Sequence, residues 1–264
     1  MDSEMNVEEF QIEGSTAVVT GSSSGIGRAI VERFADQGLD VVVTSRSREN
    51  VEPVATAINE RPGGDALPIE CDIRDWDAIE ALVEETTETL GPIDVWINNA
   101  GASFMAPFEE ISQNGWQTIV DINLNGAFNC TQVVGEWMRE NDGGTIVNVS
   151  SVAARDGAPQ MIPYAAAKAG MDKLTWTLAY EWAKYDIRIN GVMPGLVATE
   201  GLASQEDIEA DDISRERVDR EIGLPDEIAT VAQFLASPAA SYIQGQTIVA
   251  EGIPRIPRTS LHEN

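Results

Sequence analysis

The sequence predicts an α/β fold: a doubly wound, parallel, seven-stranded sheet with helices on both faces, built as a single domain. Two observations predict it. Short β-branched apolar runs alternate with longer segments of helical periodicity, and no linker rich in Pro, Gly or Ser divides them. The chain has 264 residues, 43% of them hydrophobic, which is enough for the core of one large domain. Disorder is therefore excluded as the main state of residues 1–264.

Each element follows from its local pattern. The predicted strands are runs of about five residues rich in Val, Ile and Thr, at 17–20, 41–44, 66–70, 95–98, 145–149, 188–192 and 247–250. Helical periodicity predicts helices at 26–37, 76–89, 116–139, 163–184 and 225–236. Residues 199–222 carry acids and arginines without a strand pattern and are expected to form a flap; a solvated pair of surface helices is the alternative. Residues 253–264 are expected to be an irregular tail.

Charge excludes two classes of partner. The chain has 44 acidic residues against 17 basic ones, a formal net charge of −27, so it repels phosphate backbones and anionic lipid headgroups. Nucleic acid and membrane surfaces are not expected as partners. Only three of the cations are lysines, at Lys168, Lys173 and Lys184. This acid-rich, lysine-poor composition suits a halophilic protein, because molar salt screens its self-repulsion; an ordinary acidic protein at moderate salt is the alternative.

The remaining composition points to a cytoplasmic protein without a metal. The start, Met1-Asp2-Ser3-Glu4, is acidic where a signal peptide is basic, and no apolar run reaches 18 residues. Cys71 and Cys130 are too few for a disulfide scaffold and lack a metal-ligand spacing with His262, the one histidine. We expect both cysteines to be small buried hydrophobes. A Ser-His-Asp triad is not expected either.

The first predicted strand runs directly into a glycine-rich turn, Gly21-Ser22-Ser23-Ser24-Gly25-Ile26-Gly27, where a helix begins. Free backbone N–H groups and the positive end of the helix dipole suit a pyrophosphate there. In such a motif the first glycine permits the sharp turn, the second the approach of the cofactor, and the third close packing of the helix. The strand–turn–helix context favours a nucleotide site over a mere tight connection. The predicted contacts are Gly21, Ser23, Ser24, Gly25, Ile26 and Gly27.

The end of the second strand, Thr44-Ser45-Arg46-Ser47-Arg48, predicts which dinucleotide binds. An acid at this point hydrogen-bonds a ribose hydroxyl, whereas an arginine accommodates a 2′-phosphate. The sequence therefore favours NADP(H), with NAD(H) as the alternative, and with Ser45 and Arg46 as contacts; pairing of the arginines with surface acids is the competing interpretation. Asp72 and Ile73 follow the third strand and are expected at the adenine, the other role of Asp72 being a helix N-cap.

Tyr164 and Lys168 are four residues apart, so a helix would set both on one face. A phenol with a pKa near 10 needs about 4 kcal/mol of differential stabilisation to react near neutrality. One ammonium about 4 Å away supplies an interaction of roughly that size at an effective dielectric of 20. The pair therefore predicts a reactive phenol, with a bound oxidised nicotinamide adding to the effect.

Polar groups follow two further strands. Ser150-Ser151 ends the fifth strand and Asn98-Asn99-Ala100-Gly101 the fourth, and the carboxyl ends of parallel strands meet at the ligand crevice. Ser151 is expected to hydrogen-bond the substrate oxygen, and Asn123 to lie in a long helix behind the crevice. Each residue alone could be a cap or turn residue, but their co-occurrence at successive strand ends favours a site.

These motifs, together with Pro194-Gly195, resemble the signature set of the short-chain dehydrogenase/reductase family over nearly the whole chain, from about Thr16 to Gly252. The resemblance implies a Rossmann-type dinucleotide-binding domain. It implies that Tyr164 is the general acid/base, that Lys168 lowers the tyrosine pKa and binds the nicotinamide ribose, and that Ser151, rather than Ser150, polarises the carbonyl. It also implies a water held by Asn123 in a relay with Lys168. The remaining implied cofactor contacts are Asn99, Ala100, Gly101, Pro194, Gly195, Val197 and Thr199.

The sequence departs from the family pattern at two places: Ser24 stands where many NADP-dependent relatives carry a basic residue, and Glu251 where relatives often have a Gly-Gly pair. Residues 223–229 still resemble the helix start after the family's substrate flap. The pattern is most similar to reductases of 3-oxoacyl thioesters and to sugar or polyol dehydrogenases, and it implies a homotetramer or homodimer through helices 116–139 and 163–184. A catalytically silent NADP(H) sensor is the alternative, against which the intact Ser151, Tyr164 and Lys168 argue.

Overall fold

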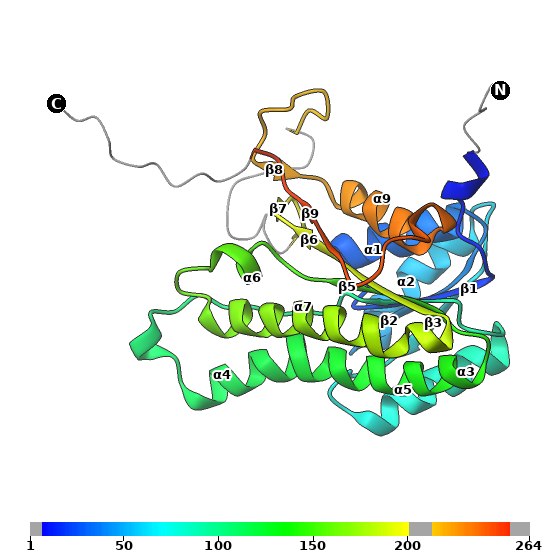
Figure 1. Ribbon diagram of the computed structural model, residues 1–264, viewed down its shortest axis with the longest axis horizontal. Coiled ribbons are helices and arrows are strands. Elements are labelled where there is room, and N and C mark those ends of the chain that lie inside the picture. Colours follow the sequence, from blue (N-terminus) through cyan, green and yellow to red (C-terminus); the bar gives the residue numbers. More distant parts are fainter. Residues whose placement is uncertain (1–6, 201–212, 254–264) are drawn as a thin grey trace.

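The computed structural model describes residues 7–200 and 213–253 and contains a seven-stranded sheet in the order β3-β2-β1-β4-β5-β6-β9, with every pairing parallel (Figure 1). The predicted fold class is thereby confirmed. The strands are β1 Thr16–Thr20, β2 Asp40–Ser45, β3 Ala66–Glu70, β4 Val95–Asn98, β5 Gly144–Val149, β6 Ile187–Pro194 and β9 Thr247–Ala250. His262, residues 1–4, residues 201–212 of the expected flap and residues 254–264 of the expected tail lie outside the described residues.

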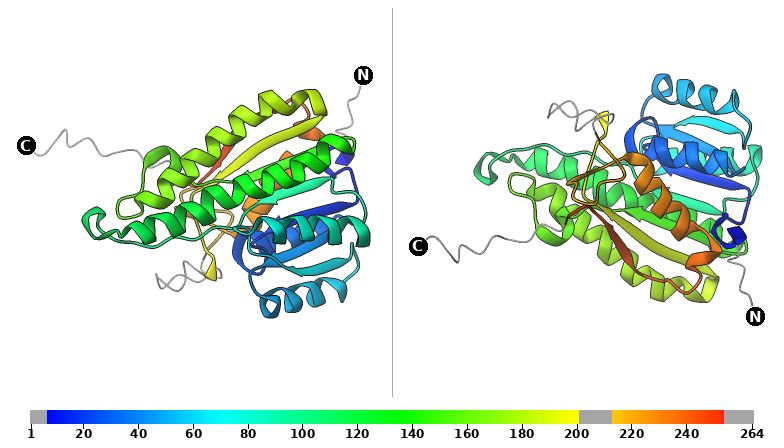
Figure 2. Two further views of the ribbon diagram at one scale, coloured as in Figure 1. Left: turned by 90° about the horizontal axis from the view of Figure 1, so that it is seen from below. Right: turned by 90° about the horizontal axis from the view of Figure 1, so that it is seen from above.

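Helices cover both faces of the sheet (Figure 2). One face carries α1 Gly25–Asp36, α2 Arg48–Asn59 and α9 Pro225–Ala236; the other carries α3 Trp76–Thr89, α4 Gln113–Val120, α5 Gly126–Glu140 and α7 Ile162–Trp182. A short helix, α6 Ala153–Asp156, follows β5, and 3₁₀ turns lie at Val7–Phe10, Phe108–Glu110, Ala183–Tyr185 and Pro238–Ala240. The predicted set lacks α2, whose internal Pro53 interrupts the helical pattern.

The two helical layers bury two hydrophobic cores, one on each face of the sheet. Side chains alternate along a strand, so Val19 of β1 joins the core under α1 and α9, whereas its neighbour Val18 joins the core under α3 and α5. Strand β1 is buried along its whole length. A central parallel strand covered on both faces therefore reads as a continuous apolar run, which is how the sequence shows it.

The order of the strands fixes where a ligand can bind. Strand β1 pairs with β2 on one side and with β4 on the other, so the chain's winding reverses between β1 and β4. A crevice opens outside the carboxyl ends of the strands at such a switch point. The turn after β1, the segment after β4 and the serines after β5 consequently share one edge of the sheet.

The predicted helix 116–139 is wrong in one respect: it is two helices, α4 and α5, joined by a π-helical segment at Asp121–Asn125. The hydrophobic period over 24 residues does not reveal a single-residue insertion of this kind. The predicted helix 163–184 likewise ends earlier, at Trp182, and continues as a 3₁₀ turn. Figure 1 shows α4 and α5 following one another along one line, with α7 running beside them at the bottom of the view.

The expected flap is bracketed by a small parallel pair, β7 Leu196–Val197 with β8 Ile222–Gly223. The sequence predicted no strand at 222–223, because two residues carry no periodic signal. Within the ranges 7–200 and 213–253, no helix has the length and hydropathy needed to cross a bilayer.

Candidate active site

The glycine-rich turn is shaped for a ligand that approaches the backbone. Gly21 and Gly25 have φ angles of +64° and +56°, a region in which a side chain is strained. A Cβ on Gly21 would lie 2.8 Å from Ala100 Cα, and one on Gly25 would lie 3.2 Å from Thr199 Cγ2. The Ser24 side chain caps none of the described N–H groups at the start of α1. These N–H groups and the cradle above them fit a pyrophosphate.

The third glycine makes room for a side chain from the neighbouring strand. A Cβ on Gly27 would lie 2.4 Å from Asn99 Nδ2 and 2.5 Å from the Gly21 carbonyl oxygen. Asn99 Nδ2 donates to the carbonyls of Thr20 (2.9 Å) and Gly21 (3.0 Å). Thr20 Oγ1 accepts the N–H groups of Asn99 and Ala100, both at 3.0 Å. Asn99 therefore joins the ends of β1 and β4 and holds the turn in shape.

Ser22, in the middle of the same turn, is a supporting residue of the site that the sequence prediction missed. Its buried hydroxyl donates to the Val19 carbonyl (2.7 Å) and accepts the Thr44 N–H (2.9 Å). The turn is thereby fixed against β2. One serine among three in a row gives no signal that it alone points inward.

The two arginines after β2 behave differently. Arg48 Nε pairs with Glu52 Oε1 at 2.7 Å along α2, as the competing interpretation expected for both. Arg46 is exposed and forms no ion pair within 4 Å in the described part of the chain, although its charge lowers the pKa of Asp72. The Ser45 hydroxyl donates to the Ser47 carbonyl (3.1 Å). Only Arg46 therefore keeps its guanidinium available for a phosphate.

The residues after β3 are held by their neighbours. The N-cap of α3 is Asp75, which accepts the N–H groups of Asp77 and Ala78, so the N-cap alternative for Asp72 is wrong. Arg74 Nη2 lies 2.5 Å from Asp72 Oδ2 and holds the pKa of that carboxyl below its usual value. Ile73 is buried and touches the position that a Cβ on Gly126 of α5 would take.

Tyr164, Lys168 and Ser151 meet at the carboxyl end of β5. Lys168 is 2% exposed; its Nζ donates to the Val149 carbonyl at 2.8 Å and lies 5.7 Å from the centre of the Tyr164 ring. The Ser151 hydroxyl faces the Tyr164 hydroxyl and favours its ionised form. The i, i+4 spacing on α7 thus brings the amine and the phenol into one site beside the serine.

Burial acts on both ionisable groups. It lowers the pKa of Lys168 to about 8, against the opposing charge of Asp172. It raises the pKa of the Tyr164 phenol, and the neighbouring Ser151 hydroxyl opposes that rise. The pKa of Tyr164 is thus raised and not lowered as expected, because the effect of burial exceeds that of the Ser151 hydroxyl. Tyr164 is therefore protonated at neutral pH and can donate a proton.

Asn123 lies in the π-helical segment and is fully buried. Its Nδ2 donates to the carbonyls of Ala102 (2.7 Å) and Ile119 (2.9 Å), and its Oδ1 accepts the Ala102 N–H (3.3 Å). A Cβ on Gly101 would lie 2.8 Å from Asn123 Oδ1 and 3.7 Å from Lys168 Nζ. Gly101 thus lies directly beside both the amide oxygen and the ammonium, and a side chain there would press on the amide.

The elements that carry these groups are joined below the site by a buried polar network. Asn98 of β4 donates to Asn148 of β5 and to Thr131 of α5, each at 2.8 Å, and accepts from Trp96 Nε1. Asn148 in turn donates to Thr175 of α7 at 2.8 Å. Asn98 is consequently a structural residue, and the network fixes α7 relative to β4 and β5.

Comparison with known proteins agrees with this arrangement. The family model for short chain dehydrogenases matches residues 15–210. The chain belongs to this family. A 3-oxoacyl-acyl-carrier-protein reductase of Thermotoga maritima is 37% identical over 244 residues, covering 92% of this chain and 98% of the relative. The protein is accordingly an oxidoreductase acting on hydroxyl or carbonyl groups.

Two solved structures of short-chain dehydrogenases show the same fold. A gluconate 5-dehydrogenase from Burkholderia cenocepacia J2315, in complex with NADP and tartrate, superposes with a TM-score of 0.84 at 30% identity, covering 93% of this chain and 97% of the other. A 7α-hydroxysteroid dehydrogenase complexed with NADH and 7-oxo-glycochenodeoxycholic acid has a TM-score of 0.84 at 31% identity, covering 94% and 96%. Relatives on this fold therefore include proteins with either nicotinamide cofactor.

The remaining predicted contacts of this short-chain dehydrogenase lie along the ends of β6 and β7. Pro194 ends β6, Val197 is buried in β7, and Thr199 contacts the glycine-rich turn at Gly25. Glu251 lies against Gly195: a Cβ there would be 2.8 Å from Glu251 Cβ. The structure thus brings the expected nicotinamide border and the turn to the same side of the crevice.

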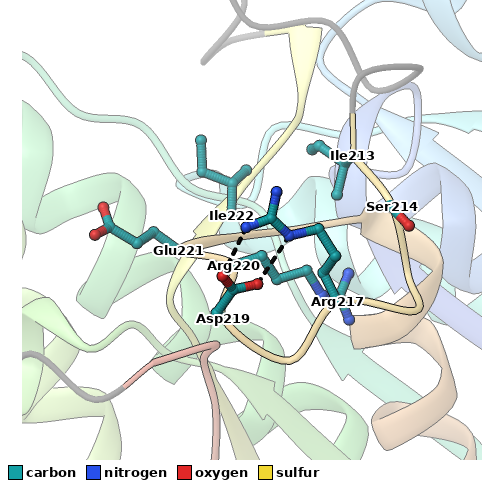
Figure 3. A pocket seen from close by; sticks show the side chains of 7 residues that line it. All are labelled: Ile213, Ser214, Arg217, Asp219, Arg220, Glu221 and Ile222. Carbon is teal, nitrogen blue, oxygen red and sulfur yellow. Dashed lines mark hydrogen bonds and ion pairs between the residues drawn. The ribbon is translucent and has the colours of Figure 1, made fainter.

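A hollow lies on the described part of the expected flap, between Ile213 and Ile222 (Figure 3). Figure 3 shows Arg217 and Asp219 pointing toward one another, with Arg217 Nε 2.8 Å from Asp219 Oδ1. Arg220 pairs with Glu227 of α9. Tyr164, Ser151 and Lys168 do not line this hollow, which belongs to the flap. Within the described ranges, no group of three or more His, Cys, Asp or Glu side chains could hold a metal ion.

Proposed function

We propose that this short-chain dehydrogenase transfers a hydride between a nicotinamide cofactor, NADP(H) in preference to NAD(H), and a carbonyl/alcohol substrate. The observation that carries the proposal is the meeting of Tyr164, Ser151 and Lys168 at the strand ends beside the glycine cradle. The turn from Gly21 to Gly27 would hold the pyrophosphate, and Lys168 the nicotinamide ribose. When bound, the nicotinamide supplies or accepts the hydride.

The chain's own residues handle the proton and the substrate oxygen. Tyr164 donates its proton to the oxygen during reduction and takes it back during oxidation. Ser151, whose hydroxyl faces the phenol, donates a hydrogen bond to the same oxygen and stabilises it. The Lys168 ammonium stabilises the phenolate that remains. Asn123 would hold a water in a proton relay with Lys168; both side chains lie beside Gly101.

The substrates that we propose are 3-oxoacyl thioesters or sugars and polyols. The names of the Thermotoga and Burkholderia relatives support these two classes. Residues 199–222 would serve as the flap over the substrate; the anchoring of their described end to α9 and to Ile253 supports this role.

We propose a homotetramer or homodimer in the cytoplasm of a halophile. Exposed aromatic side chains on the outer faces of the long helices support assembly through them: Trp116, Phe128, Trp176 and Tyr180. The free, buried thiols of Cys71 and Cys130 support a reducing compartment. The net charge of −27 supports a saline one.

A substrate panel followed by cofactor absorbance tests the reaction. Against 3-oxoacyl thioesters, sugars and polyols, the Tyr164→Phe variant should lose about 10²–10⁴-fold in kcat while it binds the cofactor normally in a fluorescence titration. Tyr185→Phe is the matched control, because Tyr185 lies in a 3₁₀ turn after α7 and contacts Arg139 and Lys184 only through its ring. Turnover retained by Tyr164→Phe would contradict the proposed proton donor.

The cofactor preference is tested at Arg46. Arg46→Ala should weaken binding of NADP(H) about tenfold or more while leaving NAD(H) nearly unchanged, because a charge-assisted contact with the 2′-phosphate is lost. Arg48→Ala is the matched control: its guanidinium is already paired with Glu52, so the ratio of the two affinities should stay at the wild-type value. An unchanged ratio in Arg46→Ala would remove the basis for an NADP(H) preference.

A further inference from the structure

Helix α7 carries a half-buried carboxylate, Asp172, that the proposed reaction does not use. Asp172 lies one helical turn after Lys168, as Tyr164 lies one turn before it, so the three ionisable groups follow one another on one side of the helix. Lys168 Nζ donates to the Val149 carbonyl of β5, and Thr247 Oγ1 of β9 donates to Asp172 Oδ1 at 3.4 Å. Both side chains therefore turn from α7 toward the sheet.

A glycine in β6, Gly191, leaves room for the contact between Thr247 of β9 and Asp172. Gly191 pairs with Asn148 on one side and with Thr247 on the other. A Cβ on Gly191 would lie 2.8 Å from Thr247 Oγ1 and 3.2 Å from the Asn148 carbonyl oxygen. Without a side chain at this point of the sheet, the threonine hydroxyl has room to reach the Asp172 carboxylate across the strand.

The same carboxylate faces the strand end that bears the catalytic serine. Ser150 is 3% exposed, and its hydroxyl has no partner within ordinary hydrogen-bond distance in the described part of the chain. The acidic group that it faces is Asp172, which interacts with it favourably. Ser151 follows Ser150 directly. Asp172 therefore interacts both with Lys168 and with the strand end that carries Ser151.

Few polar or charged groups surround Lys168. On α7 they are Tyr164 and Asp172; β5 contributes the Val149 carbonyl, and the π-helical segment contributes the neutral Asn123, which lies beside Gly101 as Lys168 does. Among the described residues, Asp172 is the acid that favours the ammonium, while burial disfavours it. The exposed Lys173 faces Asp172 in turn, and burial raises the pKa of the Asp172 carboxyl.

We propose that Asp172 is a positioning residue whose carboxylate, anchored by Thr247 and facing Ser150, keeps the Lys168 ammonium protonated through the pH range of the reaction. The effect on catalysis rests on the proposed function, in which Lys168 stabilises the Tyr164 phenolate. The interaction between the Asp172 and Lys168 side chains does not depend on that function. It can therefore be measured without a substrate.

The direct test is an NMR titration of the protein labelled with ¹³C at lysine Cε, without cofactor or substrate. The chain has three lysines, so three signals are expected, and Lys168→Met identifies the one of interest. In the wild type the Lys168 signal should titrate near pH 8. In Asp172→Asn it should titrate at least about 0.5 pH unit lower, because the negative charge that favoured the ammonium is gone, and Asp172→Glu should restore it.

The kinetic test follows the pH profile of carbonyl reduction. Because the ammonium is needed, the wild-type rate should fall as Lys168 loses its proton near pH 8, and the basic limb of Asp172→Asn should move to lower pH with the lysine titration. A movement of 0.5 pH unit lowers the rate about threefold on that limb. Asp186→Asn is the matched control: it removes one acid at the other end of the sheet, where φ is +57° and Asn is tolerated, and should move neither titration nor profile.

Equal Lys168 titrations in the wild type and Asp172→Asn would overturn the inference, whatever the activity, and so would a changed KM with an unmoved pH profile. Absence of turnover with every substrate of the panel would instead overturn the proposed function and leave the lysine titration to decide this point. Should Asp172→Asn fail to fold, the wild type still decides. Its Lys168 signal should show a second, smaller inflection at acid pH as Asp172 gains its proton, and a single inflection overturns the inference.

Discussion

At the glycine-rich turn, the missing side chain of Gly27 is a packing requirement. Its φ lies outside the left-handed region, so the backbone there does not demand glycine, but the Asn99 amide and the Gly21 carbonyl occupy the place of a Cβ. Asn99 also bonds Thr20, at the end of β1. One hydrogen atom in place of a methyl group therefore allows the ends of two strands and a helix to meet at the phosphate site.

Gly27→Ala should destabilise the fold by about 1–3 kcal/mol and weaken cofactor binding, because neither the backbone carbonyl nor the amide that bonds it can move aside freely. Thermal unfolding and a fluorescence titration with NADPH measure the two effects. Gly223→Ala is the matched control, since its Cβ would meet its nearest neighbour, Glu227 Oε2, at an ordinary 3.5 Å. Equal melting temperatures for the two variants would contradict this account of Gly27.

At the scale of elements, the π-helical segment between α4 and α5 brings a buried amide to the site. Asn123 bonds the backbone of Ala102 in both directions and the carbonyl of Ile119 one turn earlier. The segment thereby attaches the loop after β4 to helices α4 and α5. A regular helix of the same length would rotate the residues after the insertion by about 100°.

Asn123→Ala should lower the free energy of unfolding by roughly 2 kcal/mol, because it leaves the partly buried Ala102 backbone groups and the buried Ile119 carbonyl without this partner, and should lower kcat as well. Asn125→Ala is the matched control in the same π-helical segment: its amide bonds only Asp121 at an exposed position, so its melting temperature should stay near that of the wild type. Denaturant unfolding separates the two. A loss in Asn125→Ala as large as in Asn123→Ala would indicate that the segment, and not the amide, is sensitive.

At the scale of the whole molecule, the large negative net charge determines how the stability of the fold depends on salt. The net charge of −27 is spread over a surface on which exposed ion pairs such as Arg28–Glu32 and Arg48–Glu52 contribute little individually. Repulsion among the unpaired acids acts over about 30 Å at 0.01 M salt but over only about 3 Å at 1 M. The folded state should therefore be favoured by salt.

The melting temperature should rise by at least about 4 °C between 0.05 M and 2 M KCl, which corresponds to roughly 1 kcal/mol or more for a chain of this size. Calorimetry at both concentrations measures it. Sucrose at matched osmolality controls for general exclusion of the co-solute and should give a smaller rise. Full stability in dilute buffer would count against a saline habitat.

The sequence by itself determined the layers, the seven strands, the phosphate turn and the Tyr164–Lys168 spacing, because each is written in local periodicity or in a backbone requirement of a few adjacent residues. It also placed α3 and α9 at their observed bounds. It could not show the π-helical insertion at Asn123, since a one-residue change of phase between two short helices has no local signal of its own.

Only the tertiary structure decided what surrounds these groups. The contact of Thr247 with Asp172 joins residues 75 positions apart, and Asn99 meets the turn from a distance of 78. The direction in which the pKa of Tyr164 moves depends on how far the phenol is removed from water, which no spacing of letters records. Burial and long-range contacts arise only when the chain folds. The sequence could therefore predict the residue types of the site, but only the structure shows how their pKa values are shifted.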